Sequence, residues 1–190
     1  MYYIFTDGSS SRKRKTIGSA YAIFNQNKEL ISSYGFGFSD NQGRTGIAEL
    51  LAVYCVLEKL LKSDKYNNEN IILYSDSQYV VNELTIWFQN QMAKNFFETK
   101  NRDLIVYLLY CLLLLKEGKN CNIEFRWIKG HQQEDSFEAF GNNLVDKLAV
   151  DAHAEFCDKK LQIIEILEEQ LKNFNQEENI LNEIKNYYLK

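Results

Sequence analysis

The sequence predicts an α/β fold in which helices pack against a layer of β-strands. Five short segments carry the apolar, aromatic and alternating residues that are typical of strands. Three of them follow one another near the N-terminus and are expected to pair antiparallel. The other two strands are separated by segments in which apolar residues recur at helical spacing. This order of elements is characteristic of a layered α/β domain.

The first part of the chain contains the three antiparallel strands and one helix. The first strand is apolar and ends at Asp7, and a polar, basic turn follows it. The turn between the second and third strands is rich in Asn, which favours turns. Apolar residues at a spacing of three and four then predict a helix. The predicted elements are strands at residues 2–7, 19–24 and 29–38 and a helix at 45–61.

The second part alternates between strands and helices. A buried strand ends at Asp76, and Ser77 is a good N-cap for the helix that follows. A further apolar helix is expected to end at Gly118, because glycine is common at helix C-termini. We predict strands at residues 71–76 and 122–128, a helix at 103–116, a long polar loop at 129–140 and a last helix after Gly141.

The chain is expected to divide into one domain at residues 1–158 and a polar helical extension at 159–190. The extension places four apolar residues on one stripe, which predicts that it docks on the domain or contacts a partner. We expect a monomer. The stripe consists of Leu161, Ile164, Leu167 and Leu171.

The composition is ordinary for a soluble globular protein, with 45% hydrophobic and 25% charged residues. A net charge of -4 does not by itself indicate a nucleic-acid binder, so local basic patches matter more than the sum. The four cysteines form no CxxC pair, which favours reduced thiols over a disulfide framework or zinc site. The longest apolar run has about 12 residues, against the roughly 20 of a membrane span. With no signal peptide at the N-terminus, we expect a cytoplasmic protein that contacts no membrane.

Four carboxylates stand where apolar residues are expected. Asp7 and Asp76 end apolar strands, whereas Glu49 and Asp146 lie within apolar helical segments. A desolvated carboxylate is strongly disfavoured unless a cation neutralises it. Several such acids without neighbouring Lys or Arg therefore predict a bound divalent metal.

The ligand set indicates which metal and which chemistry. Oxygen ligands without His or Cys favour Mg²⁺, with Mn²⁺ as a substitute. Two such ions, about 3.5–4 Å apart, stabilise the attacking and leaving oxygens of a phosphoryl displacement. The substrate is then expected to be a phosphodiester.

Five motifs in order resemble those of type 1 ribonucleases H, which include cellular enzymes and the RNase H domains of reverse transcriptases. The resemblance covers roughly residues 1–155 and implies a five-stranded mixed sheet flanked by helices. It also implies endonucleolytic hydrolysis of the RNA strand of RNA–DNA hybrids, with 5′-phosphate and 3′-hydroxyl products. The motifs are Thr6-Asp7-Gly8-Ser9, Ala48-Glu49-Leu50, Ser75-Asp76-Ser77-Gln78-Tyr79-Val80, Trp127-Ile128-Lys129-Gly130-His131 and Gly141-Asn142-Asn143-Leu144-Val145-Asp146-Lys147-Leu148-Ala149.

The resemblance also implies a role for each site residue. Asp7 would bridge two metal ions, Glu49 and Asp76 would flank one of them, and Asp146 would hold the other. Glu49 would also touch the 2′-hydroxyl of the RNA. His131 matches a loop histidine that assists proton transfer or product departure. The residues implied to contact the substrate are Gly8, Ser9, Thr45, Gln78 and Asn142.

Some positions depart from the family pattern. Thr45-Gly46 stands where the family usually has Asn followed by Asn or Gln, which reach the minor groove. The basic, Trp-rich protrusion of many members is reduced here to Trp87, Phe88, Phe96 and Phe97 with three cations, Lys94, Lys100 and Arg102, so we expect a weaker grip on the DNA strand.

Three questions stay open at this point. The basic run at residues 12–15 fits a solvated turn, a phosphate contact or, in a eukaryotic host, a nuclear address. A hybrid-binding module with weak catalysis and a nuclease acting on branched DNA are the alternative functions. The C-terminal helix is the candidate contact for a partner.

Overall fold

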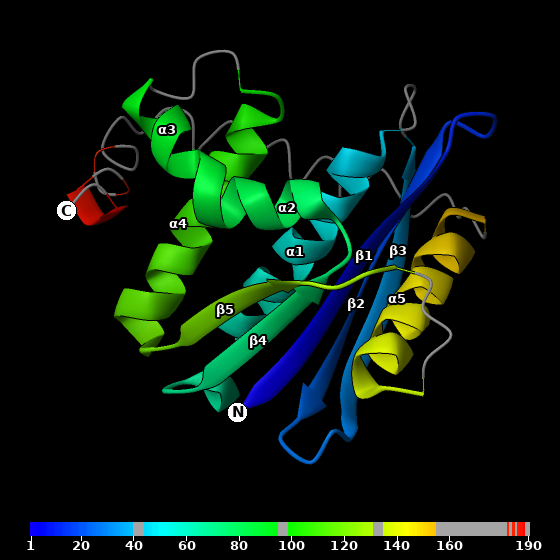
Figure 1. Ribbon diagram of the computed structural model, residues 1–190, viewed down its shortest axis with the longest axis horizontal. Coiled ribbons are helices and arrows are strands. Elements are labelled where there is room, and N and C mark those ends of the chain that lie inside the picture. Colours follow the sequence, from blue (N-terminus) through cyan, green and yellow to red (C-terminus); the bar gives the residue numbers. More distant parts are fainter. Residues whose placement is uncertain are drawn as a thin grey trace.

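The computed structural model describes residues 1–39, 44–94, 99–130, 135–154, 182, 184 and 186–188. Within these residues, three consecutive strands are followed by helices that alternate with two further strands, in the predicted order (Figure 1). The strands are β1 (Tyr2–Ser11), β2 (Thr16–Asn25), β3 (Leu30–Ser39), β4 (Asn70–Ser75) and β5 (Asn122–Trp127). The helices are α1 (Thr45–Leu61), the short 3₁₀ helix η1 (Asp64–Tyr66), α2 (Gln78–Asn82), the π-helix η2 (Glu83–Trp87), α3 (Phe88–Ala93), α4 (Arg102–Lys119) and α5 (Phe137–Ala154).

The strands form one mixed sheet in the order β3-β2-β1-β4-β5. β2 pairs antiparallel with both β1 and β3, whereas β4 pairs parallel with β1 and β5. The parallel pairing of β1 with β4 ends at Thr6 and Ser75, so Asp7 and Asp76 lie side by side directly after the last paired residues. The predicted five-stranded mixed sheet, with three antiparallel strands and then two parallel ones, is confirmed.

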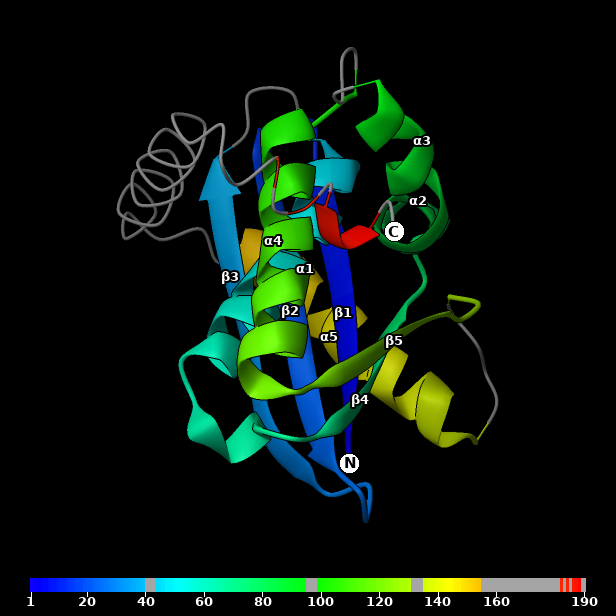
Figure 2. The same cartoon turned by 90° about the vertical axis from the view of Figure 1, so that its left-hand side faces the viewer.

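Helices cover both faces of the sheet (Figures 1 and 2). Because side chains alternate along a strand, neighbouring residues of β1 enter different cores. Ile4 packs in the core that contains α1 and α4, and Phe5 packs in the core beneath α5. The site edge of the sheet therefore lies between α1 on one face and α5 on the other.

The last helix begins earlier than predicted. α5 starts at Phe137, so the end of the predicted loop at residues 129–140 is helical. The hydroxyl of Ser136 accepts a hydrogen bond from the N–H of Ala139, as an N-cap does. The ring of Phe137 packs edge-on against Tyr3 and Phe5. Tertiary packing of Phe137 thus extends α5 by one turn into a segment whose polar sequence predicts a loop.

Two other predicted ends also differ. The helix predicted at residues 103–116, with Gly118 closing it, continues to Lys119. The C-cap is Asn120, which adopts the left-handed conformation (φ 52°) and donates its N–H to the carbonyl of Leu115. β1 and β2 extend into the predicted turn, with Ser11 paired to Thr16, so that only residues 12–15 form the hairpin tip. Ser77 is the predicted N-cap and accepts the N–H of Val80, which confirms the start of α2.

The described residues near the C-terminus pack on the domain. Ile184 is fully buried, and the ring of Tyr188 lies edge-on to Phe88 of α3. The apolar stripe predicted at residues 161–171 and the domain boundary at 158 lie outside the described residues. In the part of the chain that is described, no helix has the length and apolar character of a membrane span.

Candidate active site

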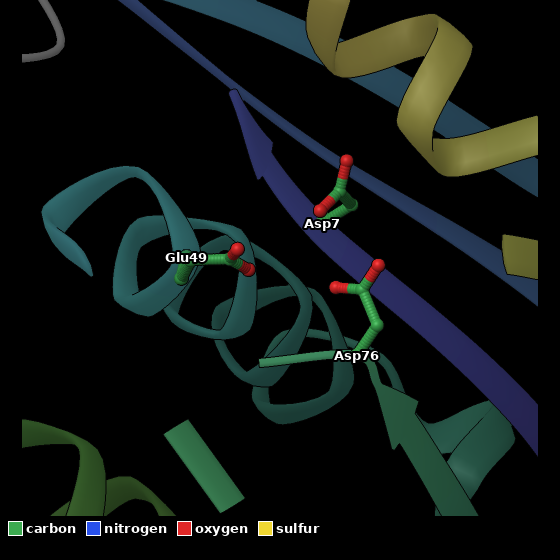
Figure 3. Close-up of side chains that lie close together, drawn as sticks. All are labelled: Asp7, Glu49 and Asp76. Atoms are coloured by element: carbon green, nitrogen blue, oxygen red, sulfur yellow. The ribbon is translucent and has the colours of Figure 1, made fainter. Parts of the chain in front are cut away.

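Three of the four predicted carboxylates meet at one edge of the sheet (Figure 3). Asp7 lies on β1, Glu49 on α1 and Asp76 directly after β4. Each offers an oxygen that lies within 4.8 Å of an oxygen on the other two. Asp7 and Glu49 are buried, and Asp76 is half-buried. The predicted convergence of these three acids is therefore a feature of the fold.

Glu49 reaches the strand edge because α1 passes very close to β1. A side chain at Gly8 would place its Cβ 2.2 Å from the backbone nitrogen of Glu49, so only glycine permits this approach. On the neighbouring strand, the buried hydroxyl of Ser19 donates to the carbonyl of Ala48 at 2.7 Å. These two contacts hold the first turns of α1 against the strands that present Asp7.

The three acids repel one another. Burial raises the pKa of Glu49 well above its usual range, and the charges of Asp7 and Asp76 raise this pKa further. The backbone N–H of Gly8 acts in the opposite direction, but it does not offset the other effects. Glu49 Oε2 is buried and has no hydrogen-bond partner among the described residues. A bound cation would offset the repulsion among the three carboxylates and would give Glu49 Oε2 the partner that it lacks.

The residues present fit a hard divalent cation. The cluster supplies only carboxylate oxygens, the ligands that Mg²⁺ and Mn²⁺ prefer. The buried, unpaired Glu49 Oε2 is an acceptor that a cation would satisfy. The donor set and its burial therefore match the metal expected from the sequence.

Asp146 does not belong to the cluster of three. It is half-buried on α5, four residues after Asn142 and on the same face of that helix. Asn142 lies at the cluster, because its Nδ2 donates to Asp76 Oδ2 at 3.3 Å. Asp146 thus stands one turn beyond a residue that contacts the site. Its role as ligand of a second ion stays a prediction.

The predicted substrate contacts have different surroundings. Gly8 is buried and Ser9 half-buried at the end of β1, and Gln78 is exposed at the start of α2. Thr45 is exposed, and its hydroxyl lies 2.8 Å from that of Ser10. Asn142, which was expected near the hybrid backbone, is buried against Asp76. His131 lies outside the described residues, directly after Gly130.

Sequence reasoning assigned no role to three residues at the site. The indole Nε1 of Trp127 donates to the backbone carbonyl of Asp76 at 2.9 Å. Gly130 lies so close to Asp76 that a Cβ there would be 2.6 Å from Oδ2. Ser19 supports the helix that carries Glu49. Trp127 and Gly130 belong to one of the five motifs, and that membership was the available signal.

Comparison with known proteins agrees with the geometry. The family model described as RNase H matches residues 1–154. The chain is 37% identical over 128 residues to the Ribonuclease HI of Helicobacter pylori strain J99, covering 67% of this chain and 79% of that protein. It is 30% identical over 153 residues to the Ribonuclease H of Orientia tsutsugamushi strain Boryong, covering 80% of this chain and 82% of that protein.

Solved structures share the fold at lower identity. RNase H1 from Halobacterium salinarum superposes with a TM-score of 0.55 at 18% identity, covering 82% of this chain and 98% of that one. A foamy viral protease-reverse transcriptase in complex with an RNA/DNA hybrid superposes with a TM-score of 0.63 at 17% identity. There the match covers 82% of this chain but only 20% of the viral chain. From the family match and the curated relatives, the chain belongs to the RNase H family.

Proposed function

We propose that this protein is a metal-dependent endonuclease that hydrolyses the RNA strand of RNA–DNA hybrids. The observation that carries this proposal is the cluster of Asp7, Glu49 and Asp76, drawn from three separate elements in a chain of the RNase H family. The products would carry 5′-phosphate and 3′-hydroxyl ends.

The acids of the site would hold the metal. Asp7, Glu49 and Asp76 would bind one Mg²⁺ or Mn²⁺, and Asp7 with Asp146 would bind a second. When bound, such ions lower the pKa of a water nucleophile and neutralise charge on the reacting phosphate. The chain's own contribution is to fix the carboxylates on rigid elements. His131, which follows the site residue Gly130 in the sequence, would assist proton transfer or the departure of the product.

Relatives support a hybrid as the substrate. LC11-RNase H1, which shares the fold with a TM-score of 0.55, has been solved in complex with an RNA/DNA hybrid. The exposed Gln78 and the Ser10–Thr45 pair lie on elements that flank the acids, where a nucleic-acid backbone would pass. Glu49 would contact the 2′-hydroxyl, the group that distinguishes RNA from DNA.

A panel of labelled substrates tests this proposal. Cleavage of an RNA–DNA hybrid, duplex DNA, duplex RNA and branched DNA would be compared in Mg²⁺, in Mn²⁺ and in EDTA. We expect cleavage of the RNA strand of the hybrid alone, and none in EDTA. Asp7→Asn is the matched inactive variant, because it removes a carboxylate from the centre of the site with little change in shape.

The other outcomes identify the rival functions. Preferential cutting of branched DNA would indicate a junction nuclease. Hybrid binding without cleavage in either metal would indicate a binding module. Full activity of Asp7→Asn would contradict the role assigned to that residue.

A further inference from the structure

Asp76 accepts hydrogen bonds from side chains on two neighbouring elements. Its side-chain Oδ2 accepts a hydrogen bond from Asn142 Nδ2 at 3.3 Å, and its backbone carbonyl accepts one from Trp127 Nε1 at 2.9 Å. Asn142 lies on α5, and Trp127 is the last residue of β5. Two elements on different sides of β4 therefore restrain one candidate ligand.

Gly130 allows this arrangement. A Cβ at this position would lie 2.6 Å from Asp76 Oδ2, which is shorter than any ordinary contact. The chain after β5 can thus pass directly beside the carboxylate. Any larger residue would displace the carboxylate from the oxygen position that Asn142 now contacts.

The chemistry of Asn142 fixes which of its atoms faces the carboxylate. An ionised carboxylate only accepts hydrogen bonds, so the amide must present its nitrogen to Asp76. The side chain is 2% exposed, and its Oδ1 has no hydrogen-bond partner among the described residues. A buried amide with an unsatisfied acceptor costs folding free energy, so its presence here favours a functional role for the contact with Asp76. The Oδ1 atom is also a suitable acceptor for a water bound to a cation at the site.

We infer that Asn142 is a positioning residue that, together with Trp127, holds the Asp76 carboxylate in the orientation that faces Asp7 and Glu49 (Figure 3). This inference rests on the proposed function, because it assigns Asp76 to a metal. The sequence implied that Asn142 contacts the hybrid directly. The inference assigns Asn142 a contact with a candidate metal ligand instead. Partners of this kind set metal affinity by keeping the ligand in place before the metal arrives.

Metal binding in the absence of nucleic acid tests the inference. Mn²⁺ affinity would be measured by calorimetry for the wild type, Asn142→Ala and Asn143→Ala. Asn143 is the matched control, because it is the adjacent Asn on the same helix and is exposed. We expect Asn142→Ala to weaken Mn²⁺ binding about 10- to 100-fold, the usual effect of losing such a partner. Asn143→Ala should bind Mn²⁺ like the wild type.

A double-mutant cycle separates positioning from general structural damage. In an Asp76→Asn background the carboxylate is already gone, so adding Asn142→Ala should change Mn²⁺ affinity no further. Hybrid binding in EDTA should be the same for Asn142→Ala and the wild type. A weaker hybrid affinity with unchanged Mn²⁺ affinity would make Asn142 a substrate contact and overturn the inference. Unchanged values for both would also overturn it.

A second variant covers the case in which Asn142→Ala does not fold. Trp127 is 46% exposed, so Trp127→Phe removes the indole N–H with little loss of packing. We expect it to weaken Mn²⁺ binding in the same direction, and unchanged affinity would overturn the inference. If the wild type binds Mn²⁺ but cleaves no hybrid, the proposed function fails, while the Mn²⁺ measurements still decide the role of Asn142.

Discussion

Glu49 carries its carboxylate into a buried position beside two other acids. It is 7% exposed, its Oε2 has no partner among the described residues, and its pKa is raised by burial and by Asp7 and Asp76. Such a group destabilises the metal-free fold at neutral pH. For the same reason, a cation bound at the site would stabilise the ionised form of Glu49 strongly. The residue is therefore suited to binding a metal rather than to stabilising the fold.

We predict that Glu49→Gln stabilises the metal-free protein and removes the stabilisation given by Mg²⁺. The neutral amide keeps the size of the side chain but ends the repulsion with Asp7 and Asp76. In EDTA at neutral pH the free energy of unfolding should rise by about 0.5–3 kcal/mol, the range usual for one substitution. Urea denaturation in EDTA and in Mg²⁺ measures both effects. Glu117→Gln, at an exposed position on α4, should change neither, and a loss of stability in EDTA for Glu49→Gln would contradict the prediction.

Glu83 is a second buried acid, and it lies outside the three-acid cluster. It is 5% exposed at the start of the π-helix, and its Oε2 accepts a hydrogen bond from Gln91 Nε2 at 2.7 Å. Burial raises its pKa, and the hydrogen bond from Gln91 acts in the opposite direction. Among the described residues, Glu83 belongs to no group of acids that could hold a metal ion, so no candidate metal offsets the cost of its burial.

We predict that Glu83→Gln stabilises the protein more at high pH than at low pH. Because the folded pKa of Glu83 is raised, the folded protein retains a proton as the pH rises above the ordinary carboxyl value. Its stability therefore falls through that window and stays lower above it. The gain from Glu83→Gln should be small near about pH 4 and larger near about pH 8. Urea denaturation of both proteins at each pH gives the difference, and an equal or smaller gain at the higher pH would refute the prediction.

Among the elements, those with a clear apolar period could be predicted from sequence. α1 was predicted at residues 45–61 and is observed at those bounds, because its apolar spacing is uninterrupted. The start of α5 could not be predicted, since Phe137 is fixed by rings from Tyr3, Phe5 and Phe24 on distant strands. The π-helix between α2 and α3 also had no sequence signal, because it continues the helical pattern with one altered turn.

The β1–β2 hairpin ends in a basic tip. β1 continues in register to Ser11, so Arg12 is five residues beyond Asp7 on an extended strand, or roughly 17 Å away. Residues 12–15 are all exposed, and Lys15 has a left-handed backbone (φ 52°). A hybrid bound at the acids could reach these cations several nucleotides away from the scissile phosphate.

We predict that the double substitution Arg12→Glu and Arg14→Glu weakens hybrid binding and flattens its dependence on salt. Each phosphate contact that is lost removes about one released counterion from the salt slope. Fluorescence anisotropy over a range of KCl concentrations in EDTA measures the slope. Lys62→Glu with Lys65→Glu is the charge-matched control, because it lies after α1, at the end away from Glu49. A slope equal to that of the wild type would exclude the hairpin tip from the interface.

At the scale of the whole molecule, the contacts of the site that follow from the order of parallel strands could be predicted from the sequence. The contacts that depend on how strands pair residue by residue, or on where a helix packs, could not. Asp7 and Asp76 directly follow the last paired residues of two adjacent parallel strands, so their meeting follows from the fold class. The contact of Trp127 with Asp76 requires the pairing of Trp127 with Ser75, which no local pattern reveals. The contact of Asn142 requires α5 to lie across the sheet from α1.

The C-terminal residues add a contact that apolar periodicity did not identify. Tyr187 and Tyr188 line the same pocket as Leu84 of η2 and Phe125 of β5. The ammonium group of Lys116 lies 5.4 Å from the ring centre of Tyr187. Ile184 joins the core that contains α1 and α4. These described residues of the extension therefore pack as part of the domain that carries the site.

We predict that Ile184→Ala lowers the free energy of unfolding by about 2–5 kcal/mol, the usual cost of truncating a buried isoleucine. Ile86→Ala is the matched control, because Ile86 is 60% exposed on the neighbouring π-helix, whereas Ile184 is fully buried. The control should cost no more than about 0.5 kcal/mol. Mn²⁺ affinity should stay unchanged in Ile184→Ala, since Ile184 is not one of the three acids that would hold the metal. If the two isoleucine variants lose equal stability in urea denaturation, the extension does not contribute to the folded domain as its packing indicates.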